Sequence, residues 1–379
     1  MANKKKTKGK DSKKSGKVKK GSNGKKGKKD KKGAKAKKSK KKGKSPKLSG
    51  TLEKVPVRAD SAATLPEVEP APIDTGERPP TAAPRAYDLP VDAEPVKEHL
   101  HPERPISELL RVDAGFVLAD FDPSSTPGFD GDKETAEQAL VAFADEIGEW
   151  QERLWAESKA GGQRSLLVVL QGLDSAGKGG IVRHVMRHAD PAGIKATSFK
   201  APTPEEKRHS FLWRIRKALP APGQIGVFDR SHYEDVLVVR VLDLAPQMVI
   251  EQRYPTINDF ERGLVDGGTQ IVKLFLCISK DEQRDRLMER LRRPDKHYKF
   301  NPGDTDNRAH WDAYQEAFQI MLDRTSTDVA PWHIIPANHK WYARYAAQQL
   351  ILEKLRQMSP DWPLPDYDVD AEMARLASS

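Results

Sequence analysis

Apolar residues gather in five short runs between residues 166 and 335, and amphipathic segments separate these runs. The runs cover residues 166–170, 196–199, 225–228, 271–278 and 332–335. Each run has the length of a strand. Most positions in the runs are apolar, with Thr197, Ser198, Lys273 and His333 as polar exceptions, and apolar stretches of this length are typical of strands buried on both faces. Five such strands joined by helical crossovers predict an α/β fold, in which helices flank a five-stranded parallel sheet. Ligands of such sheets bind at the carboxyl ends of the strands.

Polar residues mark where several helices begin. Asp132 is a predicted N-cap, because apolar side chains follow it at the three-and-four spacing of one helix face. These side chains are Leu140, Phe143, Ile147, Trp150 and Leu154. Thr203 with Glu206, and Ser279 with Glu282, match the capping box, in which the hydroxyl accepts from an amide and the Glu reaches back. We therefore expect one helix after Asp132 and further helices after Thr203 and Ser279.

Positive charge is concentrated at the N-terminus. Residues 1–50 contain 24 Lys and two acidic residues, a net charge of +22, whereas residues 51–379 carry −12. The lysines repel one another and the segment has almost nothing to bury, so we expect a disordered tail. The remainder is acidic, which argues against a broad nucleic-acid-binding face on the folded part.

Composition divides the chain into four parts. The Lys-rich tail, 1–50, precedes a linker rich in Pro, Ala and acidic residues, 51–105. The patterned region, 106–358, is the predicted catalytic domain, and residues 359–379 form a C-terminal extension. The sequence does not determine the oligomeric state, and our working expectation is a homo-oligomer.

The single cysteine, Cys277, excludes an intrachain disulfide framework and a cysteine-based zinc site. It lies within an apolar run, so we expect a buried thiol. No stretch of the sequence reaches the length of an apolar membrane span, and the basic N-terminus is not followed by the apolar segment of a secretion signal. We therefore expect a cytoplasmic protein without membrane insertion.

A phosphate-binding loop follows the first predicted strand. Gly172, four further residues and then Gly177-Lys178 have the spacing of this motif, and they lie between a strand and a helix. Glycines let the backbone N–H groups converge on phosphate oxygens, while Lys178 adds a mobile positive charge. The candidate phosphate ligands in the loop are Gly172, Ser175, Ala176, Gly177, Lys178 and Gly179.

The same loop departs from the usual motif at one position. Gly179 follows the lysine, where a Ser or Thr ordinarily helps to hold Mg²⁺. Another side chain must then bind the metal, and Asp174 within the loop is the natural candidate. A purely local role for Asp174, stabilising the turn, would leave the missing ligand unexplained.

The third predicted strand ends in a second group of charged residues. Asp229 is its last residue and fits a carboxylate that faces magnesium. Arg230 comes next and can bind phosphate with two parallel hydrogen bonds. Glu234 and Asp235 add carboxylates at the same end of the sheet. We therefore expect Asp174, Asp229 and Glu234 to be metal ligands.

Basic residues crowd the segment after the fourth predicted strand: Arg284, Arg286, Arg290, Arg292, Arg293, Lys296 and Lys299. A flexible segment here, about 284–310, is predicted to be a helical lid that brings cations over the transferring phosphate. Arg290 and Lys299 are the lid residues that we expect to bind phosphate. Lys200, just past the second strand, is either a further phosphate ligand or a surface residue.

Taken together, these residues resemble the polyphosphate kinase 2 family. The resemblance rests on segments 172–180, 197–200, 228–235 and 297–301, and it extends from about residue 106 to about residue 355. It implies a P-loop kinase fold similar to that of thymidylate kinase, a dependence on Mg²⁺, and reversible phosphoryl transfer between polyphosphate and nucleoside mono- or diphosphates. The segment 231–235 looks most like the branch that accepts both AMP and ADP, with GMP and GDP as further possible acceptors.

By the same resemblance, Asp174 would bind metal and position the acceptor phosphate, and Lys178 and Arg230 would hold phosphates. These three are the expected catalytic residues. Glu234 and Asp235 would serve the nucleotide and the metal.

Two other classes of function compete with this interpretation. One is a P-loop kinase that uses ATP to phosphorylate a nucleotide or another small molecule. The other is a binding protein that acts through its tail, which the intact Asp174, Lys178 and Arg230 argue against. The Lys-rich tail is not part of the family pattern. As a polycation it can bind polyphosphate, nucleic acid or an anionic membrane surface, or it can simply solubilise the protein.

Overall fold

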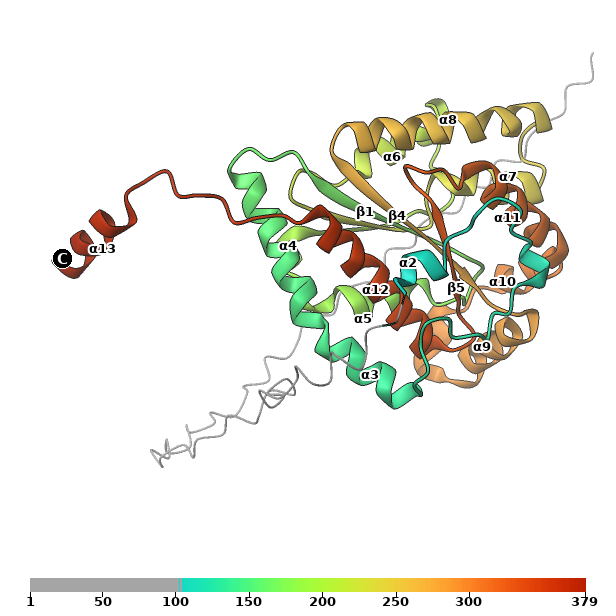
Figure 1. Ribbon diagram of the computed structural model, residues 1–379. Helices are drawn as coiled ribbons and strands as arrows, with labels where there is room; N and C mark the ends of the chain where they lie inside the picture. Colours follow the sequence, from blue (N-terminus) through green and yellow to red (C-terminus); the bar gives the residue numbers. More distant parts are fainter. Residues whose placement is uncertain (1–101, 103) are drawn as a thin grey trace, which may run out of the picture. The chain divides into compact units, whose positions relative to one another are not determined.

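The computed structural model describes residue 102 and residues 104–379 of the chain (Figure 1). The predicted tail, 1–50, and nearly all of the predicted linker, 51–105, lie outside the described residues.

Five parallel strands form one sheet in the order β2-β3-β1-β4-β5. The strands are β1 Ser165–Gln171, β2 Ile194–Ser198, β3 Ile225–Asp229, β4 Thr269–Cys277 and β5 Trp332–Pro336. All five runs overlap strands, which confirms the predicted parallel sheet. The prediction that each strand is buried is wrong for β2, which lies at the edge of the sheet and is only partly buried. Because β1 is central, the loops that follow β1, β3 and β4 leave the same edge side by side. This edge holds the candidate site.

Helices connect the strands and cover both faces of the sheet (Figure 1). The α-helices are α2 Ile106–Leu109, α3 Lys133–Ala142, α4 Ala144–Lys159, α5 Lys178–Val185, α6 Leu212–Ala218, α7 Val238–Val241, α8 Gln247–Asp266, α9 Lys280–Arg292, α10 Pro302–Arg308, α11 Trp311–Thr325, α12 Lys340–Met358 and α13 Val369–Ala377. Short 3₁₀ helices are η1 Leu118–Asp120, η2 Met186–His188, η3 Pro191–Gly193, η4 Glu206–Arg208, η5 His232–Asp235 and η6 Pro294–Lys299. None of the described helices is both long and apolar enough to span a bilayer.

Alternate residues of β1 enter two separate apolar cores. Leu166, Val168 and Leu170 pack with α3, α4, α5 and α12, whereas Leu167 and Val169 pack with α6, α8 and α11. All five side chains are fully buried. Because successive residues of a strand point to opposite faces, a continuous apolar run is what a sheet covered on both sides requires.

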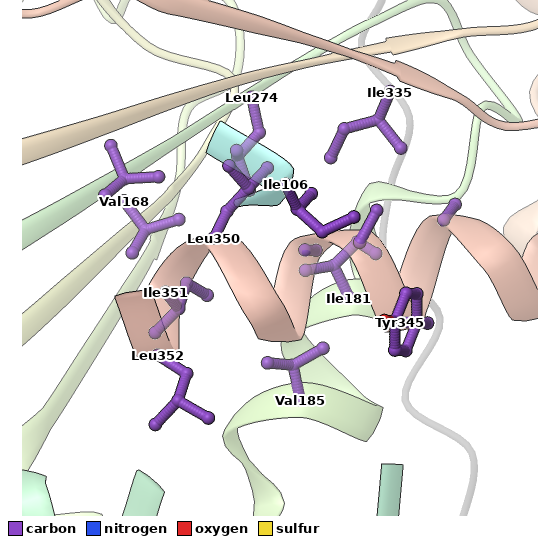
Figure 2. Close-up of a cluster of buried hydrophobic side chains, with 14 of the residues drawn as sticks. Ile106, Val168, Ile181, Val185, Leu274, Ile335, Tyr345, Leu350, Ile351 and Leu352 are labelled. Atoms are coloured by element: carbon purple, nitrogen blue, oxygen red, sulfur yellow. The ribbon is translucent and has the colours of Figure 1, made fainter. Parts of the chain in front are cut away.

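Figure 2 shows the first of these cores, where α12 lies against the sheet. Val168 and Leu274 from the central strands approach Leu350 of α12, and Ile181 and Val185 of α5 reach the same helix. Each fully buried side chain of this kind stabilises the fold by roughly 1.5–3 kcal/mol. The packing fixes α5, and α5 begins at the lysine of the predicted phosphate loop.

Two local predictions are corrected by the structure. The single helix expected after Asp132 is two helices, because Phe143 has φ −95° and ψ 0° and interrupts α3 and α4. Asp132 does cap α3 by accepting from the Thr135 amide. The box at Ser279 is half formed: its hydroxyl accepts from the Glu282 amide, but its own amide donates to Asn338.

The box at Thr203 is complete, with both reciprocal hydrogen bonds to Glu206. The helix that it starts is only the short η4. The single cysteine, Cys277, is buried as expected, and burial raises the pKa of its thiol to about 12.

Candidate active site

The loop between β1 and α5 has the backbone of a phosphate cradle. Gly172 and Gly177 have φ of +145° and +116°, and Ser175 between them has φ +68°. A Cβ at Gly172 would lie 2.7 Å from the Leu276 carbonyl oxygen, so a larger residue does not fit. Glycine is therefore required at this position by close packing as well as by backbone conformation. Gly179 faces open space, so the site itself does not exclude a side chain there.

Lys178 is held with its ammonium inside the loop. The side chain is only 8% exposed, and Nζ donates to the carbonyl oxygens of Gly172 at 2.7 Å and Leu173 at 3.2 Å. Burial lowers the pKa of Lys178, while the carboxylates of Asp229 and Asp174 act in the opposite direction. A cation with so little access to water is a strong electrostatic partner for a phosphate in the same loop.

Asp174 and Arg230 form an ion pair across the site, from Arg230 Nη2 to Asp174 Oδ1. Burial alone would raise the pKa of Asp174, but Lys178 and Arg230 outweigh it and hold the pKa below its ordinary value. Arg230 has φ +64°, a left-handed conformation that is costly for a long side chain. Strain of this kind is typical of functional residues whose orientation is fixed by the surrounding fold.

Glu234 lies close to Arg230, Lys178 and Asp174. With its amide nitrogen turned toward this carboxylate, Gln171 donates to Oε1 at 3.1 Å. Burial raises the pKa of Glu234, although Arg230 and Lys178 oppose the rise.

Asp235 points elsewhere. It lies between Arg253 at 3.5 Å and Arg214 at 3.9 Å. The pKa of Asp235 is raised by burial, and these same two arginines oppose the rise. The η5 helix thus directs its two carboxylates to different partners, a distinction that the sequence did not reveal.

The expected metal ligands do not form a cage. Within residues 102 and 104–379, no three Asp, Glu, His or Cys side chains are grouped so that they could enclose a metal ion. Asp174, Asp229 and Glu234 all act on the ammonium of Lys178. Mg²⁺ in kinases commonly takes only one or two carboxylates and completes its shell with water and substrate phosphates. The carboxylates around Lys178 fit that arrangement.

A cationic pocket of about 890 Å³ opens beside the phosphate loop. Its basic side chains come from five parts of the fold, namely α5, the segments after β2 and β3, the lid segment and α12: Lys178, Arg183, Lys200, Arg230, Arg286, Arg290, Arg293, Lys296, Lys299, Lys340 and Arg344. The expected phosphate ligands Lys200, Arg290 and Lys299 are therefore brought together with the loop. This cationic pocket is built for a ligand with many negative charges.

A second pocket, of about 760 Å³, lies on the other side of the Asp174–Arg230 pair. Its apolar lining comes from Phe199, Phe211, Leu237, Val238, Val239, Leu242, Leu244, Tyr314 and Phe318. Asp235, Arg214 and Arg253 also line it. Asp174, Phe199, Lys200 and Arg230 line both pockets, so the mixed pocket and the cationic pocket meet at the ion pair.

The lid segment contains α9, η6 and α10, and its arginines have different surroundings. Arg290 lies 3.4 Å from Asp304 and lines the cationic pocket. Arg284 is exposed and pairs with Asp281 and Asp285. Arg286, which the sequence grouped with them, is buried behind the phosphate loop.

Several residues of the site carried no recognisable sequence signal. Asn307 on α10 donates to Asp174 Oδ2 at 3.5 Å, and Asp304 lies close enough for Asp174 to raise its pKa further after burial. Lys340 and Arg344 come from the start of α12, after β5. Their position at the carboxyl end of a strand was the one clue available.

Residues 130–363 match the polyphosphate kinase 2 family. The chain is 45% identical over 257 residues to an AMP/ADP-polyphosphate phosphotransferase of Meiothermus ruber, covering 68% of this chain and 95% of the relative. It is 36% identical over 270 residues to an ADP-polyphosphate phosphotransferase of Rhodopseudomonas palustris, covering 68% and 90%. The crystal structure of polyphosphate kinase 2 from Arthrobacter aurescens superimposes with a TM-score of 0.72 at 52% identity, covering 73% of this chain and 98% of that one. The glycine loop, the strained arginine and these matches together show that the chain belongs to the polyphosphate kinase 2 family.

Proposed function

We propose that this enzyme transfers a phosphoryl group reversibly between inorganic polyphosphate and a nucleoside mono- or diphosphate. Adenine nucleotides are the preferred acceptors in this proposal, because one relative is named for AMP and ADP and another for ADP. The observation that carries the proposal is the pair of pockets that meet at Asp174 and Arg230.

The chemistry of each pocket matches one substrate. The cationic pocket offers charge along an extended path, which suits a chain of phosphates with one negative charge or more per unit. The mixed pocket offers aromatic and aliphatic side chains for a base and ribose, and Arg214 and Arg253 at its polar side. Two substrates that enter from opposite sides would present their reacting phosphates to each other at the shared residues.

At the shared residues, catalysis is mainly a matter of position and charge. The loop N–H groups and Lys178 hold the phosphoryl group that is transferred, and Arg230 is placed to stabilise the charge spread over its oxygens. Asp174 orients Arg230 through their ion pair. Because both cations lie in a largely buried site, their interaction with phosphate is stronger than it would be in water.

Mg²⁺ is the cofactor in this proposal. Asp174, Asp229 and Glu234, which all lie close enough to act on Lys178, are the residues that would hold it. When bound, the ion would neutralise phosphate oxygens.

The remaining parts of the chain take supporting roles. Residues 106–358 form the catalytic domain in this proposal, with residues 284–310 as its lid and residues 359–379 as an extension. The enzyme would act in the cytoplasm as a homo-oligomer. The tail, 1–50, with its +22 charge, would bind polyphosphate near the catalytic domain, and nucleic acid is its competing ligand.

The deciding experiment is a matrix of donors and acceptors. Purified enzyme is incubated with polyphosphate or ATP as the sole donor, and with AMP, ADP, GMP or GDP as acceptor. We expect nucleotide phosphorylation with polyphosphate in the absence of ATP. If nucleotide is phosphorylated with ATP but not with polyphosphate, the enzyme is an ATP-dependent kinase and the proposal is overturned.

A further inference from the structure

Arg286 borders the cationic pocket, but its guanidinium is directed at backbone carbonyl groups of the phosphate loop. The side chain is 5% exposed. One terminal nitrogen, Nη1, donates to the carbonyl oxygens of Ser175 at 3.0 Å and Ala176 at 2.9 Å. The other, Nη2, donates to the carbonyl oxygens of Ala337 and Asn338 in the turn after β5.

The remaining donor of this guanidinium is also used. Nε donates to Glu282 Oε1 at 2.6 Å on the same helix. An arginine has five N–H donors, and these contacts use all of them. Burial lowers the pKa of Arg286, and Glu282 opposes the shift. A guanidinium keeps its proton in proteins. Arg286 is thus a permanent cation with no N–H left for a substrate.

The carbonyl groups that it contacts belong to peptides of the phosphate loop. The Ala176 carbonyl shares its peptide with the Gly177 N–H, and a cation bonded to the oxygen draws electron density away from that N–H. Hydrogen bonds linked through one peptide strengthen each other in this way. Of the two peptides that Arg286 contacts, that of Ala176 already uses its N–H within the loop, donating to Leu173 O at 3.1 Å, so the N–H of Gly177 is the one directed to phosphate.

We propose that Arg286 is a positioning residue for polyphosphate transfer. It fixes the loop carbonyls against α9 and the turn after β5, and it makes the Gly177 N–H a stronger donor toward the phosphate, without touching the substrate. The inference rests on the proposed function for its kinetic consequence. Its effect on the Gly177 N–H holds whatever the substrate is.

Kinetics separate positioning from simple loss of fold. Arg286→Met removes all five hydrogen bonds, and Arg286→Lys keeps the charge with at most three donors. Arg284→Met is the matched control, because Arg284 lies on the same helix but is exposed. We expect Arg286→Met to lower kcat/KM for polyphosphate about a hundredfold, the scale of a misplacement near 1 Å, with a raised polyphosphate KM and an unchanged nucleotide KM. The kcat/KM of Arg286→Lys should lie between those of Arg286→Met and the wild type. The kcat/KM of Arg284→Met should equal that of the wild type.

A merely structural residue would give another pattern. If Arg286 only kept the protein folded, its loss would reduce the active fraction and therefore kcat, leaving both KM values unchanged. That result, or an equal effect in Arg284→Met, would overturn the proposal. If Arg286→Met does not fold, Arg286→Lys alone decides between the two patterns.

A second readout needs no catalysis. Labelling with carbonyl-¹³C alanine and ¹⁵N glycine selects the Ala–Gly steps, of which the chain has four, ending at Gly115, Gly161, Gly177 and Gly193. We expect the Gly177 amide proton to move upfield in Arg286→Lys and Arg286→Met, while the other three stay in place. An unmoved Gly177 resonance would overturn the inference. Wild-type enzyme that is inactive with polyphosphate would instead overturn the proposed function, and the Gly177 resonance would still test Arg286.

Discussion

Lys273 Nζ lies 2.7 Å from Glu261 Oε2, and both side chains are fully buried beneath the η5 helix. The ammonium also donates to the Thr325 carbonyl at 2.6 Å and to the Tyr233 hydroxyl at 2.8 Å. Glu261 accepts from the Tyr233 hydroxyl at 2.7 Å and lies 3.1 Å from His232 Nε2. His232 and Tyr233 directly follow the Arg230–Ser231 step, so this buried pair supports the loop that carries Arg230 and Glu234.

The first prediction concerns the stability of this pair. Lys273→Met should lower the free energy of unfolding by about 3–5 kcal/mol, because it leaves the Glu261 carboxylate buried without its cation. The double variant Lys273→Met with Glu261→Gln should recover part of that loss, since no buried charge remains. Urea denaturation of the wild type, both single variants and the double variant gives the coupling. Strictly additive losses would contradict the buried ion pair.

The Lys273–Glu261 pair also makes the free energy of unfolding depend on pH. Burial would raise the pKa of Glu261, but Lys273 and His232 outweigh it and hold the pKa below 4.5. A depressed carboxyl pKa stabilises the fold above the unfolded value, and that stabilisation is lost as pH falls through the folded pKa. Lowering the pH below about 4.5 should therefore destabilise the wild type more than the double variant, as urea midpoints at several pH values would show. Equal losses would argue that other carboxylates dominate.

The sequence predicted the sheet because consecutive apolar residues dominate its central strands, a signal that does not depend on distant residues. It predicted the loop at Gly172 because spacing alone defines that motif. The partners of Ser279 were not predictable, since Asn338 reaches its amide only after the sheet has formed. The sequence also grouped Arg286 with the basic residues of the lid, although its place on the helix indicated a buried position. Arg286 shares the buried face of α9 with Gln283 and Leu287, a three-and-four spacing that was visible but hidden by the count of basic residues.

Lys178→Ala should remove nearly all phosphoryl transfer and leave the fold intact. The variant loses the buried ammonium at the transferring phosphate, which should raise the barrier by several kcal/mol, a rate loss on the order of a thousandfold. Steady-state rates with polyphosphate and ADP, alongside thermal unfolding, check both statements. Near-normal turnover in a folded variant would show that the phosphate loop is not the site of transfer.

Asp174→Asn should raise the Mg²⁺ concentration needed for half-maximal rate, because Gly179 offers no hydroxyl ligand. Asp235→Asn is the matched control, since Asp235 pairs with Arg214 and Arg253. The control should leave the Mg²⁺ dependence unchanged and raise the nucleotide KM instead. Magnesium titrations of the three proteins test this, and an unaltered Mg²⁺ requirement in Asp174→Asn would remove Asp174 from the metal ligands.

The last prediction concerns the Lys-rich tail, 1–50, whose charge of +22 precedes a remainder of −12. A polycation binds a polyanion by releasing counterions, so its affinity falls steeply as salt rises. A tail that holds polyphosphate would raise the local concentration of that substrate without changing the transfer step. Deleting residues 1–50 should therefore raise the KM for long-chain polyphosphate at low salt, and leave kcat and the nucleotide KM unchanged.

Two comparisons make the tail experiment decisive. At high ionic strength the difference between full-length and truncated enzyme should fade, because the lysines are screened beyond about 10 Å already at 0.1 M salt. Short polyphosphate should show a smaller difference than long polyphosphate at every salt concentration, since a chain must reach the tail and the cationic pocket at once to gain from both. If the truncated enzyme has the same long-chain KM at low salt, the tail does not serve polyphosphate. Binding of the isolated tail to RNA, measured at the same salt, would then test the competing ligand.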